Sequence, residues 1–269
     1  MKKIAVINDI SGFGKCSLTV ALPIISAHGI QCCPLPTGVF SNQTGYESFF
    51  SVDLTEAMPA YIEEWKTLQA CFDGILTGFI PNAAQAAIIS EFIDAFATDN
   101  TVTLVDPIMG DDGAVYPCYD SDSINAVKTL AQKADILTPN VTELALLCDR
   151  EPTAELTADE IRALSASLGG QAVITTGILL DEHTIANAVY DGERFELVTA
   201  QRRGNHFSGT GDIFSAYVLS EVLSGVSLVD AVKNASSFIE KAIEETLKTE
   251  PAQHYHPDGI AFEKLLKIQ

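Results

Sequence analysis

Residues 209 to 212 read Gly-Thr-Gly-Asp and come directly before a segment with helical periodicity. Because Gly209, Thr210 and Gly211 are small or flexible, several of their backbone N–H groups can point at one anion, helped by the helix dipole. Asp212 then places a carboxylate in the first helical turn, beside that anion. Accepting the proton of an attacking hydroxyl is a task that would justify a carboxylate there. The simpler interpretation is an acidic residue that only favours the dipole at a helix start.

Two further stretches supply oxygen ligands. Residues 105 to 113 place Asp106 and Asp111 near the end of a β-like run, and residues 138 to 147 place Asn140 and Glu143 three positions apart at a predicted helix start. Such ligands, without histidine or thiolate, suit Mg²⁺ that bridges to substrate phosphates. The Asn140 and Glu143 spacing is also typical of a helix cap with a first-turn acid. Together with Gly-Thr-Gly-Asp, these residues indicate phosphoryl transfer from a nucleotide.

The glycine-spaced loop at residues 8 to 20 completes no nucleotide-binding motif. A Walker A loop needs glycine where Asp9 stands and Ser or Thr where Cys16 stands. A dinucleotide fingerprint needs its third glycine where Ser17 stands, which also disfavours a nicotinamide dehydrogenase. Because the carboxylate of Asp9 suits a hydroxyl or an amine better than a phosphate, we assign this loop to the acceptor's side of the site.

The elements that must position these residues follow an alternating order. Short apolar or β-branched runs are separated by stretches of helical periodicity, which predicts an α/β protein of parallel βαβ units. No linker, repeat or low-complexity segment divides residues 1–269, so a single domain is expected. Two β-like runs flank Asp191 and Gly192, which predicts a hairpin at an antiparallel edge of the sheet.

Polar residues follow the predicted parallel strands at their carboxyl ends. In open α/β sheets this is the edge where ligands bind. The residues at these ends are Asp9, Thr77, Gly78, Asp106, Asn140, Thr175 and Thr176. The sequence therefore predicts one site along one edge of the sheet.

The composition excludes several classes of partner. A formal net charge of −20 repels nucleic acid and anionic membranes. No apolar run is long enough to span a bilayer, and the amino-terminal residues turn polar too early for a secretory signal, so a cytoplasmic protein is expected. The six cysteines have no Cys-x-x-Cys spacing, which predicts idle thiols.

The chain resembles the ribokinase-like superfamily and, within it, the pyridoxal kinases of vitamin B6 salvage. The resemblance rests on the stretches LPTGVFSNQTGY (35–46), ILTGF (75–79), VDPIMGD (105–111), TPNVTEL (138–144), VITT (173–176) and GTGD (209–212). Of these, FSNQTGY is the most substrate-specific, and together they cover nearly the whole chain. The resemblance implies a three-layer α/β/α sandwich with a mostly parallel central sheet and an antiparallel edge hairpin, in a homodimer.

The resemblance also implies a reaction and roles for single residues. The reaction would transfer a phosphoryl group from ATP to the 5′-hydroxymethyl of pyridoxal, pyridoxine or pyridoxamine, with Asp212 as base. The phosphoryl group would lie at Gly209, Thr210 and Gly211. The remaining roles would be Mg²⁺ binding at Asp106 and Glu143; nucleotide contacts at Asp111, Asn140, Thr175, Thr176 and Thr210; and vitamer contacts at Asp9, Phe40, Thr44, Phe79 and Tyr116.

The opening loop departs from this pattern. Many pyridoxal kinases have a serine-histidine pair where this chain has Asp9 and Ile10, and the loop is similar to the Asp-x-Ser-Gly loop of hydroxymethylpyrimidine kinases of thiamine synthesis. That activity is the alternative. A non-catalytic vitamin B6 binder on the same fold is a third interpretation, which Asp212 disfavours. The sequence leaves open the preferred vitamer, a need for a monovalent cation such as K⁺, and the roles of Lys15, Arg202, Arg203 and His206.

Overall fold

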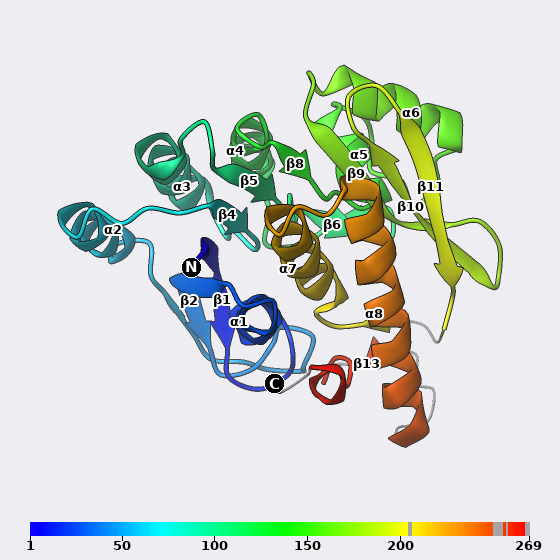
Figure 1. Cartoon of the computed structure of the whole chain (residues 1–269), viewed down its shortest axis with the longest axis horizontal. Coiled ribbons are helices and arrows are strands. Elements are labelled where there is room, and N and C mark those ends of the chain that lie inside the picture. Colours follow the sequence, from blue (N-terminus) through cyan, green and yellow to red (C-terminus); the bar gives the residue numbers. More distant parts are fainter. Residues whose placement is uncertain (204–205, 250–254, 257, 267–269) are drawn as a thin grey trace.

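The computed structural model in Figure 1 describes residues 1–203, 206–249, 255–256 and 258–266. The elements of this part of the chain follow one another in the order β1 (Lys3–Ser11), α1 (Leu18–Ala27), β2 (Gln31–Phe40), β3 (Ser51–Asp53), α2 (Met58–Thr67), β4 (Gly74–Thr77), α3 (Ala83–Phe96), β5 (Val102–Val105), β6 (Gly110–Asp111), β7 (Ala114–Val115), α4 (Ser121–Ala131), β8 (Ile136–Leu137), α5 (Val141–Leu147), α6 (Ala158–Ser167), β9 (Ala172–Leu179), β10 (Thr184–Tyr190), β11 (Phe195–Gln201), β12 (His206–Phe207), α7 (Thr210–Leu223), α8 (Leu228–Thr249), β13 (Tyr255–His256) and a 3₁₀ turn, η1 (Glu263–Leu265).

The described residues form a nine-stranded sheet with the strand order β11-β10-β9-β8-β5-β4-β1-β2-β3. The strands from β9 to β2 in this order pair in parallel, whereas β10 and β11 form an antiparallel hairpin at one edge. Tyr190 pairs with Phe195 at the end of that hairpin, so the connection contains Asp191 and Gly192 as predicted. The predicted α/β class, parallel sheet and edge hairpin are therefore confirmed.

Helices cover both faces of the sheet (Figure 1). Helices α1, α7 and α8 share one hydrophobic core with Ile4 and Val6, while α2 to α6 share the other with Ala5 and Ile7. Because side chains alternate across a strand, the continuous apolar run of β1 supplies both cores. The arrangement is the expected three-layer sandwich. None of the helices in the described ranges has the length and apolar content to cross a membrane.

Local side chains explain where helices begin. Helix α5 starts with a capping box in which Asn140 and Glu143 each bond the other's backbone N–H, and α6 starts with the same arrangement at Thr157 and Glu160. Strand β3, helix α2 and the β6–β7 hairpin were not predicted. Helix α2 starts without a side-chain cap, but it has a proline in its first turn and an apolar stripe of Met58, Ile62 and Trp65, a pattern that the sequence analysis did not use.

The strand order reverses at β1. The chain passes from β1 through α1 to β2 on one side, and later enters β4 on the other side of β1. In open α/β sheets, ligands bind at such a reversal, beyond the carboxyl ends of the strands. The pairing of β1 with β2 also shifts register between Asn8 and Ile10, an irregularity often found next to active sites. The fold therefore places the end of β1 at the centre of the candidate site.

Candidate functional site

The turn before α7 packs directly on the loop between β1 and α1. Gly209 caps α7 in a left-handed conformation with φ of 75°, and a Cβ atom there would overlap the carbonyl oxygen of Lys15. Only glycine fits both the conformation and the contact. The predicted anion site, Gly209 to Gly211, thus lies against the opening loop, and Thr210 turns its hydroxyl to the carbonyl of Phe207.

Asp212 lies in the first turn of α7 and is held by the opening loop. One carboxylate oxygen accepts a hydrogen bond from Nδ2 of Asn8 at 2.9 Å, and the other accepts from the backbone N–H of Ser17 at 2.8 Å. Burial raises the pKa of Asp212 to about 6. The negative charge of Asp9 also raises this pKa, whereas the two hydrogen bonds lower it. A carboxylate with this pKa is mostly ionised near neutral pH and is a better proton acceptor than an ordinary aspartate.

Asn8 connects Asp212 to the two central strands. Its Oδ1 accepts hydrogen bonds at 2.9 Å from the backbone N–H groups of Asp9 and Phe79, while its Nδ2 donates to Asp212. A Cβ atom at Gly78 would overlap the Asn8 side chain, so glycine at the end of β4 makes room for it. Asn8 is 3% exposed and thus part of the rigid sheet edge.

The side chain of Asp9 is bound by serines at the end of β1 and in the loop between β1 and α1. Its carboxylate oxygens accept hydrogen bonds from the hydroxyls of Ser17 at 2.6 Å and Ser11 at 3.0 Å, and the residue is 5% exposed. Burial raises the pKa of Asp9, although the hydrogen bonds from the hydroxyls of Ser17 and Ser11 lower it. No finding tests the vitamer contact predicted for Asp9, which stays a prediction.

Asp106 directly follows β5 and contacts helix α7, the helix that carries Asp212. Its Oδ2 accepts a hydrogen bond from the Ser215 hydroxyl at 3.1 Å, and that hydroxyl also lies 3.0 Å from the hydroxyl of Thr138. Burial raises the pKa of Asp106 to about 7, and the negative charge of Asp212 contributes. Asp212 and Ser215 are three residues apart on α7, so one helix face carries both Asp212 and the hydrogen-bond donor to Asp106.

Glu143 lies behind Asp106 on α5. Its two oxygens accept hydrogen bonds from the backbone N–H groups of Met109 at 3.1 Å and Asn140 at 2.9 Å. Burial and the charge of Asp106 hold the pKa of Glu143 well above its usual range. The amide of Asn140 donates to the carbonyl of Gly110 at 2.8 Å and lies 3.4 Å from Oδ1 of Asp111. The predicted metal and nucleotide residues of α5 and β5 to β6 are thus brought together.

The carboxyl groups of Asp106, Glu143 and Asp212 all have pKa values raised by burial. In the part of the chain that the structure describes, no lysine or arginine forms an ion pair with any of the three. Crowded oxygen donors of one charge fit a Mg²⁺ ion, which would relieve their repulsion. Asp106 and Glu143 are the residues that would hold it.

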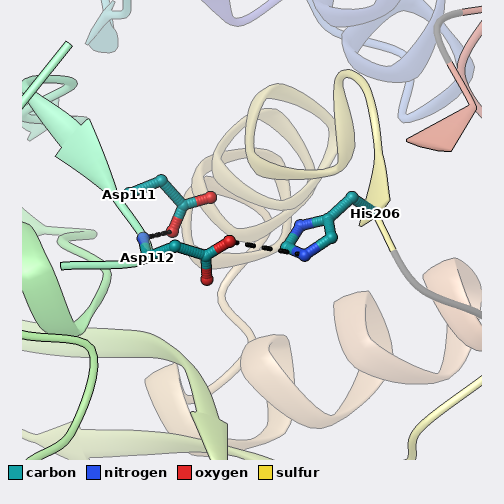
Figure 2. A group of neighbouring side chains, drawn as sticks. All are labelled: Asp111, Asp112 and His206. Carbon is teal, nitrogen blue, oxygen red and sulfur yellow. Dashed lines mark hydrogen bonds and ion pairs between the residues drawn. The ribbon is translucent and has the colours of Figure 1, made fainter. Parts of the chain in front are cut away.

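Asp111, Asp112 and His206 form a cluster at the tip of the β6–β7 hairpin (Figure 2). Oδ1 of Asp111 accepts a hydrogen bond from the backbone N–H of Asp112 at 2.9 Å, and Oδ2 of Asp112 lies 3.4 Å from Nε2 of His206. Burial raises the pKa of Asp111, and nearby His206 opposes the rise. The ion pair joins the hairpin to the segment that leads into the anion site.

The predicted vitamer residues separate into two groups. Phe40 and Phe79 line a pocket of about 130 Å³, together with Thr37, Gly38, Ser51, Val52, Asp53 and Pro81. Thr44 lies exposed in the connection between β2 and β3, and Tyr116 follows β7 with 38% of its surface exposed, so neither lines this pocket. A larger open hollow of about 510 Å³, lined from α5 and α6, contains none of the predicted site residues.

Further candidate residues from the sequence either form ion pairs outside the site or lie on β9. Lys15 donates to the carbonyl of Ile260 at 3.2 Å and pairs with Glu263, also at 3.2 Å. Arg203 pairs with Glu240 and Glu244 of α8. The backbone of Thr176 bridges to Asn140, and the hydroxyl of Thr175 is buried without a hydrogen-bond partner among the residues that the structure describes.

Sequence reasoning missed Asn8, Ser17 and Ser215. Asn8 ends an apolar run and Ser17 stands where a helix cap is expected, so both carried a positional signal. The signal did not tell which neighbour each would bind.

Comparisons with known proteins show the family and the fold. The profile of the Phosphomethylpyrimidine kinase family matches residues 22–257. A pyridoxine/pyridoxal/pyridoxamine kinase of Bordetella avium is 27% identical over 255 residues, which cover 91% of this chain and 86% of that one.

Two solved structures share the fold. A Bacteroides thetaiotaomicron protein assigned to the phosphomethylpyrimidine kinases, in a crystal form with pyridoxal, is 39% identical with a TM-score of 0.92, over 98% of this chain and 94% of that one. Pyridoxal kinase from Lactobacillus plantarum is 27% identical with a TM-score of 0.89, over 99% and 95% of the two chains.

Proposed function

The chain belongs to the phosphomethylpyrimidine kinase family, and we propose that it transfers the γ-phosphoryl group of ATP to the 5′-hydroxymethyl of a vitamin B6 vitamer. The proposal covers residues 1–269 as a single kinase domain. Pyridoxal, pyridoxine and pyridoxamine share this primary alcohol and form the proposed substrate class. The observation that carries the proposal is the placement of Asp212, with a raised pKa, beside the glycine turn at the strand reversal.

The proposed chemistry follows from these groups. The acceptor hydroxyl gives its proton to the Asp212 carboxylate while its oxygen forms a bond to the γ-phosphorus of ATP. The bond between that phosphorus and the oxygen bridging to the β-phosphate breaks, and ADP leaves. Backbone N–H groups of Gly209, Thr210 and Gly211 bind the transferring group, where negative charge develops. Bound Mg²⁺ would neutralise phosphate charge.

The nucleotide side of the proposal uses the group on α5, β6 and β9. Asp106 and Glu143 hold Mg²⁺, and contacts to the nucleotide come from Asp111, Asn140, Thr175, Thr176 and Thr210. The buried, unpartnered hydroxyl of Thr175 supports a role in binding a polar ligand group, since buried hydroxyls ordinarily find partners. A monovalent cation such as K⁺ is proposed as an activator of the phosphoryl transfer, which a phosphorylation assay with and without K⁺ would test.

The acceptor side uses the pocket at Phe40 and Phe79. Two aromatic side chains in the pocket lining fit a flat heteroaromatic ring. The backbone N–H of Phe79 donates to Asn8, which in turn donates to the proposed base, Asp212. The Bacteroides thetaiotaomicron relative crystallised with pyridoxal favours a vitamer. The family match favours hydroxymethylpyrimidine, which is also a six-membered heteroaromatic ring with a primary alcohol, as the second candidate.

One assay separates the two candidates. The protein is incubated with ATP and Mg²⁺ and with pyridoxal, pyridoxine, pyridoxamine or hydroxymethylpyrimidine, and each phosphorylated product is quantified. We expect the highest kcat/KM for a B6 vitamer. A higher kcat/KM for the pyrimidine assigns the chain to the second candidate, and tight vitamer binding without any phosphate ester assigns it to the non-catalytic binders.

The proposal includes a cytoplasmic homodimer. Sedimentation of the purified protein at micromolar concentration tests the dimer. Fractionation of the cells that produce it tests the location.

A further inference from the structure

We propose that Ser17 is the positioning residue of the catalytic base, and that it works as one unit with Asp9. The inference rests on the proposed function, because it assigns Asp212 the base role. It gives Asp9 a task distinct from the ring contact expected from the sequence. The geometry of three neighbouring groups carries it.

Ser17 contacts the base through its backbone and Asp9 through its side chain. Its N–H donates to one oxygen of Asp212 at 2.8 Å, and its hydroxyl donates to one oxygen of Asp9 at 2.6 Å. The other oxygen of Asp9 accepts from Ser11 at 3.0 Å. Asp9 is therefore fixed at both oxygens inside the loop, and Ser17 is fixed to Asp9.

The conformation of Ser17 is unusual for a serine. Its φ of 52° and ψ of −133° belong to a region that glycine populates and residues with a Cβ avoid. Ser17 also stands at the cap position of α1, where a serine hydroxyl ordinarily accepts a helix N–H, yet it makes no side-chain cap bond. Instead of capping α1, the hydroxyl donates its hydrogen bond to Asp9.

This strained conformation is what aims the N–H at Asp212. Strained backbone persists only where surrounding contacts hold it, and it clusters at active sites. The carbonyl of Ser17 accepts hydrogen bonds from the N–H groups of Val20 and Ala21, and the hydrogen bond to Asp9 is the contact that its side chain adds. The second support of Asp212, from Asn8, comes from β1 and does not depend on Ser17. Removing the anchor therefore leaves the base attached on one side and free to rotate on the other.

The test compares two variants that lose the same hydroxyl. Ser17→Ala lacks the anchor and strongly disfavours the conformation, whereas Ser17→Gly lacks the anchor but tolerates it. We expect kcat to fall about 10²-fold in Ser17→Ala, as for a misplaced catalytic group, and clearly less in Ser17→Gly. The KM values for ATP and acceptor should change less than twofold, roughly, because positioning the base is not binding.

The control is Ser26→Ala, which removes an exposed serine from the same helix and should leave kcat unchanged. Two results overturn the proposal: equal kcat in Ser17→Ala and wild type, or a loss that appears in KM alone. Asp9→Ala gives an independent variant if Ser17→Ala does not fold. The double variant Ser17→Gly with Asp9→Ala should then lose no more than Asp9→Ala alone, since the two residues act as a unit.

A measurement without turnover separates this inference from the proposed function. Amide hydrogen exchange of Ser17 is followed by NMR in wild type, Asp9→Ala and Asp212→Ala. Faster exchange in both variants supports the unit even if the wild type phosphorylates none of the tested alcohols, in which case only the proposed function fails. Unchanged exchange in both variants, with an active wild type, overturns the positioning role and leaves the function standing.

Discussion

Asp212 and Ser215 lie on one face of α7 and contact different parts of the site: Asp212 accepts hydrogen bonds from Asn8 and Ser17, and Ser215 donates to Asp106 at 3.1 Å. Because the two residues are one helical turn apart, a shift of α7 would move Asp212 and the hydrogen-bond donor to Asp106 together.

Asp212→Ala should lower kcat about 10²- to 10⁴-fold, the contribution of a general base, while ATP still binds. Asp122, in the first turn of α4, is a matched first-turn aspartate away from the site. Asp122→Ala should leave kcat unchanged. Steady-state kinetics and calorimetric ATP binding check both variants, and similar kinetics for the two would mean that Asp212 only favours its helix dipole.

The pH dependence of kcat/KM should show an acid limb near the pKa of Asp212, about 6, because the base must be ionised to accept a proton. The negative charge of Asp9 contributes to raising that pKa, so Asp9→Asn should move the limb to lower pH. Rates measured from pH 5 to 8 at constant Mg²⁺ check the shift. A limb that moves to higher pH would contradict the electrostatic coupling of the two residues.

Stability should fall as pH rises because of Asp106. Its folded-state pKa of about 7 lies above the ordinary 3.8, so the folded protein binds more protons than the unfolded chain between these values. The neutral form is favoured in the fold, and that contribution is lost as pH rises through 7. Asp106→Asn should match wild type in Tm near pH 4 and exceed it by several degrees at pH 8, at about 2–4 °C per kcal/mol.

The control for this comparison is Asp99→Asn, an exposed aspartate. Its Tm difference from wild type should stay constant across the pH range. A constant difference for Asp106→Asn as well would show that its carboxyl titrates normally.

Gly209→Ala should destabilise the protein and abolish turnover, because a Cβ atom would overlap the carbonyl oxygen of Lys15. Gly29 has nearly the same φ, 73° against 75°, but no atom of the described part of the chain lies within 4 Å of the Cβ position. Gly29→Ala therefore measures the conformational cost alone, about 1–2 kcal/mol. Urea unfolding and kcat of both variants separate strain from contact, and equal effects would refute the tight packing at Gly209.

Removal of Mg²⁺ should abolish phosphoryl transfer and should not unfold the protein. Added Mg²⁺ should raise Tm, since a cation relieves the repulsion among Asp106, Glu143 and Asp212, with about 2.7 kcal/mol at 100 times the dissociation constant. Asp106→Asn combined with Glu143→Gln should remove this stabilisation. Turnover that survives chelation would exclude the proposed role of the metal.

The sequence predicted where the site would lie better than how it would be built. Apolar runs ending in polar residues placed Asp9, Asp106 and Asn140 at one sheet edge, because strand ends align in any parallel sheet. The direction of each side chain depends on registers and turns that have no local signature. The register shift next to Asn8 and the strained backbone of Ser17 decide which residues reach Asp212, and both arise from tertiary packing.

Short elements were missed for a related reason. The β6–β7 hairpin consists of strands of two residues each, too short to show a period, yet it carries Asp111 and Asp112 to His206. Its position is set by contacts with residues far along the chain.

The contact of Lys15 with Ile260 and Glu263 joins the first loop of the protein to residues synthesised roughly 245 positions later. Contacts of such sequence separation form late in folding, since the loop entropy must be overcome first. On the ribosome, β1 and α1 emerge long before their partners, and the candidate site stays incomplete until Asp212 has left the exit tunnel. If the proposed function holds, a nascent chain stalled before residue 212 would therefore lack phosphoryl-transfer activity.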